Sequence, residues 1–293
     1  MVNAVDLTVS SRHFLVVFSI LGLLSLLHPS MTKTITPGRE EKMKTNETVL
    51  VSDADMCYHV FLDVGANIGV HCRFLFEPDK YPAAQLSRDA FDRYFGKERD
   101  NRDFCCFEFE PNQKHVKALQ NVSIAYAKQG WRFHIQNVGV SDVEELKYFF
   151  HQGDEAQNEW GFSERQRLGD VQNLTLAQST KVIRLSSWIA QHLSSRIVPK
   201  STFGNYSHGP RVVMKIDIEG SEYDVLPDLF SSGTLCQNID HMFGEFHNDI
   251  HGRFRQRLFE RSFYIMLAAA RQCNTTFDKI DDESYLLDGI PLP

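Results

Sequence analysis

The stretch Val60-Phe61-Leu62-Asp63-Val64-Gly65-Ala66-Asn67-Ile68-Gly69 decides how this chain folds. Its apolar first half predicts a buried strand, because parallel strands covered on both faces lose the alternation of apolar and polar residues. Two glycines follow, and residues 70–76 can then form a helix. A strand, a glycine-rich turn and a helix together let backbone approach a nucleotide-like ligand. Because the spacing is Gly-x-x-x-Gly, a nicotinamide or flavin is the weaker interpretation, and a tight turn without a ligand is the alternative.

Four motifs carry a family resemblance. Residues 63–69, Asp-Val-Gly-Ala-Asn-Ile-Gly, resemble the first motif of the seven-stranded S-adenosylmethionine (SAM)-dependent methyltransferases. Residues 213–226, Val-Met-Lys-Ile-Asp-Ile-Glu-Gly-Ser-Glu-Tyr-Asp-Val-Leu, resemble the signature of the FkbM-type methyltransferases. Residues 107–112 and 137–142 are similar to that family's second and third motifs, in the right order. The resemblance runs from about Cys57 to the C-terminus, and it implies a SAM-dependent methyltransferase.

The expected fold is α/β and Rossmann-like, with a seven-stranded, mostly parallel sheet, helices on both faces and a hydrophobic segment before it. The mostly parallel sheet follows from strands that alternate with helices along the chain, whereas the Rossmann-like type and the seven strands are what the resemblance implies. A helical insertion is expected around residues 86–95, and Ser221 is expected to cap a helix. Strands are expected at residues 60–63, 104–109, 131–140, 145–150, 182–185, 212–218, 239–246, 263–268 and 284–287.

The chain is expected to divide into four segments: a tail at 1–13, a hydrophobic segment at 14–28, a linker or stem at 29–55, and the methyltransferase domain at 56–293. The apolar run at 14–27 would span about 21 Å as a helix, against roughly 30 Å for the core of a bilayer. It therefore predicts a signal anchor or a signal peptide. No clear cleavage site follows the run, which favours the anchor.

Two features place the domain in the secretory pathway, in the lumen of the ER or Golgi as a single-pass membrane protein, or alternatively secreted. Five N-x-S/T acceptors begin at Asn46, Asn121, Asn173, Asn205 and Asn274, where roughly 1.5 would arise by chance. The six cysteines suit disulfides, and at least two should be paired. Cys105 and Cys106 should not bond each other, because neighbours on a strand point to opposite faces. The basic residues after the apolar run argue for the opposite, cytoplasmic orientation.

The charge of the chain bears on its partners. The net charge of −7 argues against nucleic acid, whose binding depends on Lys and Arg. Residues 249–261 form an amphipathic, basic segment whose arginines we interpret as a solvated face. The expected partners are a small-molecule or glycan acceptor, with the membrane contacted only through the N-terminal segment.

Acidic residues follow the predicted strands, and ligands of open α/β sheets bind beyond those strand ends. The resemblance implies that Gly65, Asn67 and Gly69 line the methionine part of SAM, and that Asp63 holds the turn or the amino group of SAM. It also implies that Glu110 accepts the ribose hydroxyls, with Glu108 deeper on the same face, and that Asp142 accepts from the adenine amino group.

Methyl transfer to a hydroxyl needs a base near the acceptor oxygen. The candidates, in order of preference, are Asp217, Glu219 and His247. Asp217-Ile218-Glu219 resembles a metal-binding pair in some methyltransferases, but the sequence has no His/Cys cluster with metal spacing, so no metal is expected. The alternative functions are a luminal type II glycosyltransferase, with Asp53-Ala54-Asp55 as its metal motif, and a catalytically inactive binding module on the same fold.

Overall fold

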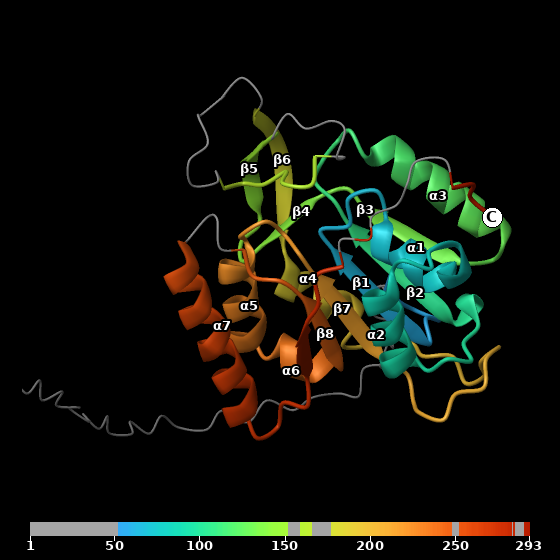
Figure 1. The fold of residues 1–293 in the computed structure, drawn as a ribbon. Coiled ribbons are helices and arrows are strands. Elements are labelled where there is room, and N and C mark those ends of the chain that lie inside the picture. Colours follow the sequence, from blue (N-terminus) through green and yellow to red (C-terminus); the bar gives the residue numbers. More distant parts are fainter. Residues whose placement is uncertain (1–51, 152–158, 166–176, 248–251, 283, 285–289) are drawn as a thin grey trace, which may run out of the picture. The chain divides into compact units, whose positions relative to one another are not determined.

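A sheet of six parallel strands, in the order β3-β2-β1-β7-β8-β9, lies at the centre of this computed structural model (Figure 1). The structure describes residues 52–151, 159–165, 177–247, 252–282, 284 and 290–293. The strands are β1 (His59–Val64), β2 (Phe104–Phe109), β3 (Arg132–Gln136), β7 (Val212–Ile216), β8 (His241–Gly244) and β9 (Thr276–Lys279). Every neighbouring pair is parallel. The Rossmann-like α/β class is confirmed, and the main sheet has six strands among the described residues where seven were expected.

Helices cover both faces of this sheet. On one face lie α1 (Val70–Phe76), α2 (Gln85–Phe95) and α3 (Val116–Lys128). On the other lie α4 (Leu185–His192), α5 (Glu222–Ser231), α6 (Thr234–Asn238) and α7 (Gly252–Ala269). In β1, Phe61 packs with the first group, whereas Val60 and Leu62 pack with the second. Because both faces of the strand are covered, its residues are apolar except for His59 and Asp63.

A second, smaller sheet follows the third strand. It contains β4 (Gly139–Ser141), β5 (Glu145–Phe150) and β6 (Ala177–Arg184) in the order β4-β6-β5. β6 pairs parallel with β4 and antiparallel with β5. The single strand expected at 131–140 is therefore wrong, because the chain leaves β3 at Gln136 and joins the second sheet at Gly139.

Two further local predictions are corrected. Residues 263–268, expected as a strand, lie in α7, where Phe263 and Leu267 are buried at helical spacing. β9 instead supplies the edge strand, and residues 285–287 of the other expected strand lie outside the described residues. Ser221 occupies the N-cap of α5 without capping it. The carboxylate of Glu222 accepts the backbone N–H groups of Ile218 and Gly220 instead, at 2.8 and 2.9 Å.

The six cysteines form three disulfides: Cys57–Cys105, Cys72–Cys106 and Cys236–Cys273. The expectations that at least two cysteines are paired and that Cys105 does not bond Cys106 are both confirmed. The first two bonds tie opposite faces of β2 to neighbouring segments, because the two cysteines alternate along that strand.

The described residues begin with a short segment that packs on the domain. Ala54 is fully buried, and the Ser52 hydroxyl donates to the carbonyl of His192 at 2.5 Å. The expected hydrophobic segment at 14–28 lies outside the described residues. Within the described part of the chain, no helix has the length and apolar character needed to cross a membrane.

Candidate active site

A cavity of about 500 Å³ lies at the carboxyl ends of β1, β7 and β8. The strand order reverses between β1 and β7, and such a switch point is where open α/β sheets bind ligands. The volume falls within the roughly 300–1,000 Å³ of small-molecule sites. Polar residues that line it include Asn67, His71, Glu110, Glu159, Lys215, Asp217, Glu219, Glu245, His247, Asp281 and Asp282.

The turn after β1 forms one wall of this cavity. Gly65 has φ +86°, and a Cβ atom there would lie 1.7 Å from the carbonyl oxygen of Asp217, so only glycine fits. Asn67 also has a positive φ, +52°, a conformation that asparagine tolerates better than most residues. Gly69 has φ +80° and opens α1, but it does not line the cavity.

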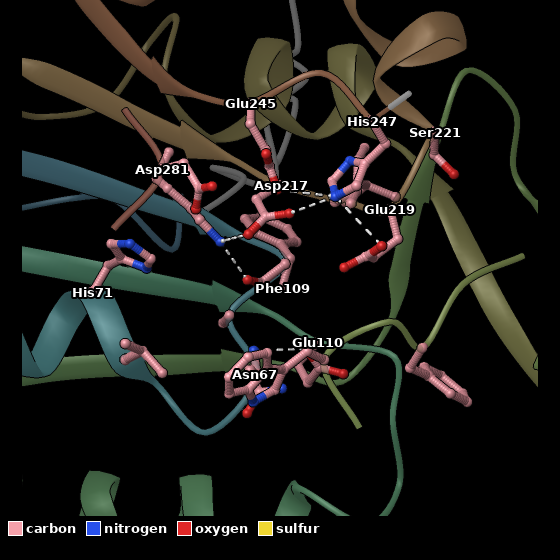
Figure 2. Close-up of a pocket in the computed structure, with 18 of the residues that line it drawn as sticks. Asn67, His71, Phe109, Glu110, Asp217, Glu219, Ser221, Glu245, His247 and Asp281 are labelled. Carbon is pink, nitrogen blue, oxygen red and sulfur yellow. Dashed lines mark hydrogen bonds and ion pairs between the residues drawn. The ribbon is translucent and has the colours of Figure 1, made fainter. Parts of the chain in front are cut away.

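Glu110 holds this turn against the end of β2. Its carboxylate accepts the backbone N–H of Asn67 at 2.7 Å (Figure 2). It also accepts the backbone N–H of Asn112 at 2.8 Å. The residue is only 5% exposed, yet it lines the cavity. Glu110 therefore fixes the turn backbone and also presents carboxylate to a ligand.

Asp63 and Glu108 lie deeper and face each other in the register of β1 and β2. Both are fully buried, and neither lines the cavity. Burial raises the pKa of Asp63 to about 6, against the opposing effect of Lys215. Burial and then the nearby Asp63 raise the pKa of Glu108 well above its usual value. The deeper position expected for Glu108 is confirmed.

Lys215 is a site residue that the sequence analysis missed. It is 4% exposed, yet its ammonium donates to the carbonyl of Gly65 at 2.8 Å. It also lies 3.1 Å from Asp217 and 3.8 Å from Asp63. Burial would lower its pKa, but these two carboxylates reverse the effect, so the pKa is raised and the lysine is charged. A lone lysine inside the apolar strand 212–216 was the available signal.

His247 lies among four carboxylates at the opposite side of the cavity, and three of them face its Nε2 atom (Figure 2). Its Nε2 atom lies 3.1 Å from Glu245, 3.4 Å from Glu219 and 3.5 Å from Asp217. Its Nδ1 atom lies 3.1 Å from the fully buried Glu222. All three expected catalytic residues therefore converge on one point.

The charges of this cluster follow from those contacts. Burial would lower the pKa of His247, but Glu222, Glu245 and Glu219 outweigh it and raise the pKa well above the usual value. The imidazole is therefore cationic at neutral pH. Burial would raise the pKa of Asp217, but Lys215 and His247 reverse that effect and leave it below the usual value. Asp217 is thus an ionised carboxylate between two cations, with its side chain 30% exposed to the cavity.

Part of the segment after β5 also reaches the cavity. Glu159, Trp160 and Phe162 line it. Burial would raise the pKa of Glu159, but hydrogen bonds from Lys114, Asn112 and His151 lower it to about 2. Ser163 donates to the carbonyl of Glu219 at 2.7 Å, which ties this segment to the FkbM-like signature. Glu159 is thus a lining residue for which the sequence predicted no role.

Asp142 is not brought to the cavity. It follows β4, where it accepts a hydrogen bond from Ser141 at 3.1 Å, whereas Gly139 and Val140 line the cavity. Its expected contact with adenine stays a prediction. The Asp53 and Asp55 pair also lies away from the cavity, and Asp55 accepts the backbone N–H of Ile197 at 2.7 Å.

Asp217, Glu219 and His247 could also hold a metal ion, because one ligand atom from each lies within 4.8 Å of the others. Carboxylate oxygens and an imidazole nitrogen form a donor set that divalent cations accept. For that, Nε2 of His247 would have to be deprotonated, with Nδ1 donating to Glu222.

The chain is similar to known methyltransferases. The family described as "Methyltransferase FkbM domain" matches residues 63–274. The crystal structure of Methyltransferase FkbM from Methylobacillus flagellatus KT is similar at 15% sequence identity and a TM-score of 0.29, over 60% of this chain and 30% of that one. No curated protein matches.

Proposed function

Because this chain belongs to the FkbM methyltransferase family, we propose that it transfers a methyl group from SAM to a hydroxyl group. The observation that supports this proposal most directly is that one cavity is lined both by residues suited to bind a nucleoside and by a residue suited to accept a proton. The turn of Gly65 and Asn67, held by Glu110, suits a nucleoside, and the ionised Asp217 beside it suits a proton acceptor.

The residues present fit SAM on several counts. The positive-φ turn at Gly65 brings backbone close to a ligand without a side chain in the way. Glu110 keeps lone pairs for ribose hydroxyls, because each backbone N–H occupies only part of one carboxylate oxygen. The lining acids also suit the positive charges of the sulfonium and the α-amino group. When bound, SAM supplies an activated methyl group, and the protein supplies orientation and a base.

Asp217 is the residue we propose as the base. It is ionised and partly open to the cavity, whereas His247 already carries a proton and cannot accept another. Lys215 and His247 hold Asp217 from two sides, so its carboxylate is oriented before an acceptor arrives. Glu219, 9% exposed and within 3.4 Å of His247, is the second candidate.

We propose a glycan or small-molecule hydroxyl in the secretory pathway as the acceptor. Three of the sequon asparagines, Asn121, Asn205 and Asn274, are exposed. Three disulfides suit an oxidising compartment. Trp160 offers the cavity a ring on which a sugar can pack, because aromatic rings present an apolar face.

A thermal melt with added ligand tests the cofactor. We expect SAM to raise the melting temperature, because it binds only the folded state. A rise with a nucleotide sugar and Mn²⁺, and none with SAM, would overturn the proposal in favour of a glycosyltransferase. If the protein binds SAM but transfers no methyl group to any of a set of hydroxyl-containing acceptors, it is instead an inactive binding module.

A further inference from the structure

Helix α7 has one buried face and one exposed apolar face. Its buried side packs on the sheet and on α5: the ring centroid of Phe259 lies 4.7 Å from that of Tyr223, and that of Phe263 lies 5.8 Å from that of Phe277. On the outside, Phe254 is 80% exposed, Leu258 57% and Ile265 58%. At 3.6 residues per turn these three side chains fall within about 40° around the helix axis. They form a narrow apolar stripe along the helix. α7 itself lies at the edge of the fold (Figure 1).

Arginines border this stripe on both sides. By helical spacing Arg253, Arg257 and Arg261 lie along one border, and Arg255 lies along the other. All four are exposed, and none forms an ion pair with another residue that the structure describes. The one acid of the helix, Glu260, pairs with Lys279 on β9 at 3.4 Å. The chain as a whole carries −7, so this face departs strongly from the average charge.

We propose that this face of α7 lies on the surface of an anionic lipid bilayer. Amphipathic helices with an apolar stripe and flanking Arg or Lys bind in the interfacial plane, where the apolar side chains enter the acyl boundary. The arginines reach phosphate groups while their aliphatic stems stay with the stripe. A bilayer contact of α7 adds to the contact expected from the N-terminal segment.

The dimensions of the stripe favour a bilayer over a protein. A standard protein interface buries roughly 800 Å² on each partner. Three apolar side chains in one row, with charges immediately on both sides, offer much less than that. A lipid surface needs no complementary shape, and the phosphate groups of its lipids can accept hydrogen bonds from each of the four arginines.

Tryptophan fluorescence in the full-length chain tests the proposal. Phe254→Trp places a reporter on the stripe at an exposed position, and Leu146→Trp, 73% exposed on β5, is the matched control off the helix. Both variants are added to vesicles of phosphatidylcholine alone and to vesicles containing brominated phosphatidylglycerol. The N-terminal segment is the same in both variants, so their difference reports α7. We expect quenching of Phe254→Trp by the brominated anionic lipid, well beyond that of Leu146→Trp.

Arg255→Gln, Arg257→Gln and Arg261→Gln, combined in the Phe254→Trp chain, measure the charge contribution. One arginine near an anionic surface is worth roughly a fivefold change in partitioning, so the triple change should weaken it on the order of a hundredfold. Equal quenching of both reporters, or quenching that survives the triple change, overturns the proposal. A blue shift of Phe254→Trp that depends on protein concentration without lipid also overturns it, in favour of a protein partner.

Discussion

Lys215 Nζ lies 3.1 Å from Asp217 Oδ2, and the two residues stand two positions apart where β7 ends. The same ammonium donates to the carbonyl of Gly65, so one buried charge joins the turn of the first motif to the acid of the FkbM signature. Because Lys215 remains charged, it holds Asp217 ionised at neutral pH. The charge of the proposed base, Asp217, is therefore maintained by Lys215, a residue buried in the sheet.

Replacing that base should remove catalysis and spare binding. Asp217→Asn keeps the size of the side chain but cannot take the proton from the hydroxyl that is methylated. We therefore expect the single-turnover rate of methyl transfer to fall by about 10²–10⁴-fold. Asp224→Asn, in the same signature but outside the cavity lining, is the control and should keep its rate. Calorimetry should show that both variants bind SAM. A near-wild-type rate in Asp217→Asn would move the role to Glu219.

Glu110 should matter for SAM affinity. Glu110→Gln keeps an oxygen for only one of the two backbone N–H groups, and it removes the charge that strengthens bonds from ribose hydroxyls. We expect affinity to fall about tenfold to a hundredfold, corresponding to roughly 1.5–3 kcal/mol. Isothermal calorimetry measures this, with the exposed Glu145→Gln as control. Unchanged affinity would show that Glu110 only supports the turn.

Stability should fall in acid through His59. Burial, then His208 and Arg211, lowers the pKa of His59 to about 3 in the folded protein, against 6.5 when unfolded. The neutral ring accepts the N–H of Arg211 at 3.1 Å. A depressed histidine pKa stabilises the fold above pH 6.5, and that contribution is lost as the pH falls toward 3.

The pKa shift of His59 should make the stability of the parent protein depend more strongly on pH than that of His59→Gln. Urea unfolding of the parent and of His59→Gln, compared from pH 7 to pH 4, should show the parent losing about 1.4 kcal/mol more per pH unit below 6.5. Carboxylates that titrate in both proteins cancel in this comparison. Parallel pH profiles for the two proteins would show that His59 is not held neutral by the fold.

The disulfides should be both mappable and stabilising. Peptide mapping without reduction should recover Cys236 linked to Cys273, whose bond closes a sequence separation of 37 residues. Replacing both by serine should lower the free energy of unfolding by about 2–4 kcal/mol, because the unfolded chain regains freedom. Recovery of six alkylated cysteines from the unreduced secreted protein would contradict this pairing.

Glycosylation tests the compartment. Asn205 lies in a loop and Asn274 precedes β9, and both are exposed. We expect N-glycans at both sites in a secretory host, so an N-glycanase should lower the apparent mass, and Asn205→Gln and Asn274→Gln should each remove one step. No shift in a host that glycosylates a control protein would place the domain in the cytoplasm.

Local sequence determined the class of the fold. The strands at 60–64, 104–109 and 212–216 are apolar apart from one charged residue each, since helices cover both of their faces, and such runs are visible without a structure. The glycine turn could also be predicted from the sequence, because the positive φ of Gly65 depends on only a few consecutive residues. The strand predicted at residues 263–268 was wrong, because a short apolar run fits a buried helix as well as a strand.

Tertiary structure alone decided which residues of the candidate site are in contact. Lys215 and Asp63 lie on separate strands that are joined by a register of β1 with β7, and His247 meets Asp217 only because β8 ends beside β7. Whether a buried group is charged depends on such long-range neighbours: burial alone would neutralise both Lys215 and His247, and the facing carboxylates reverse it. Sequence spacing carries no information on those distances, so the candidate residues could be named from the sequence while their charges and roles could not.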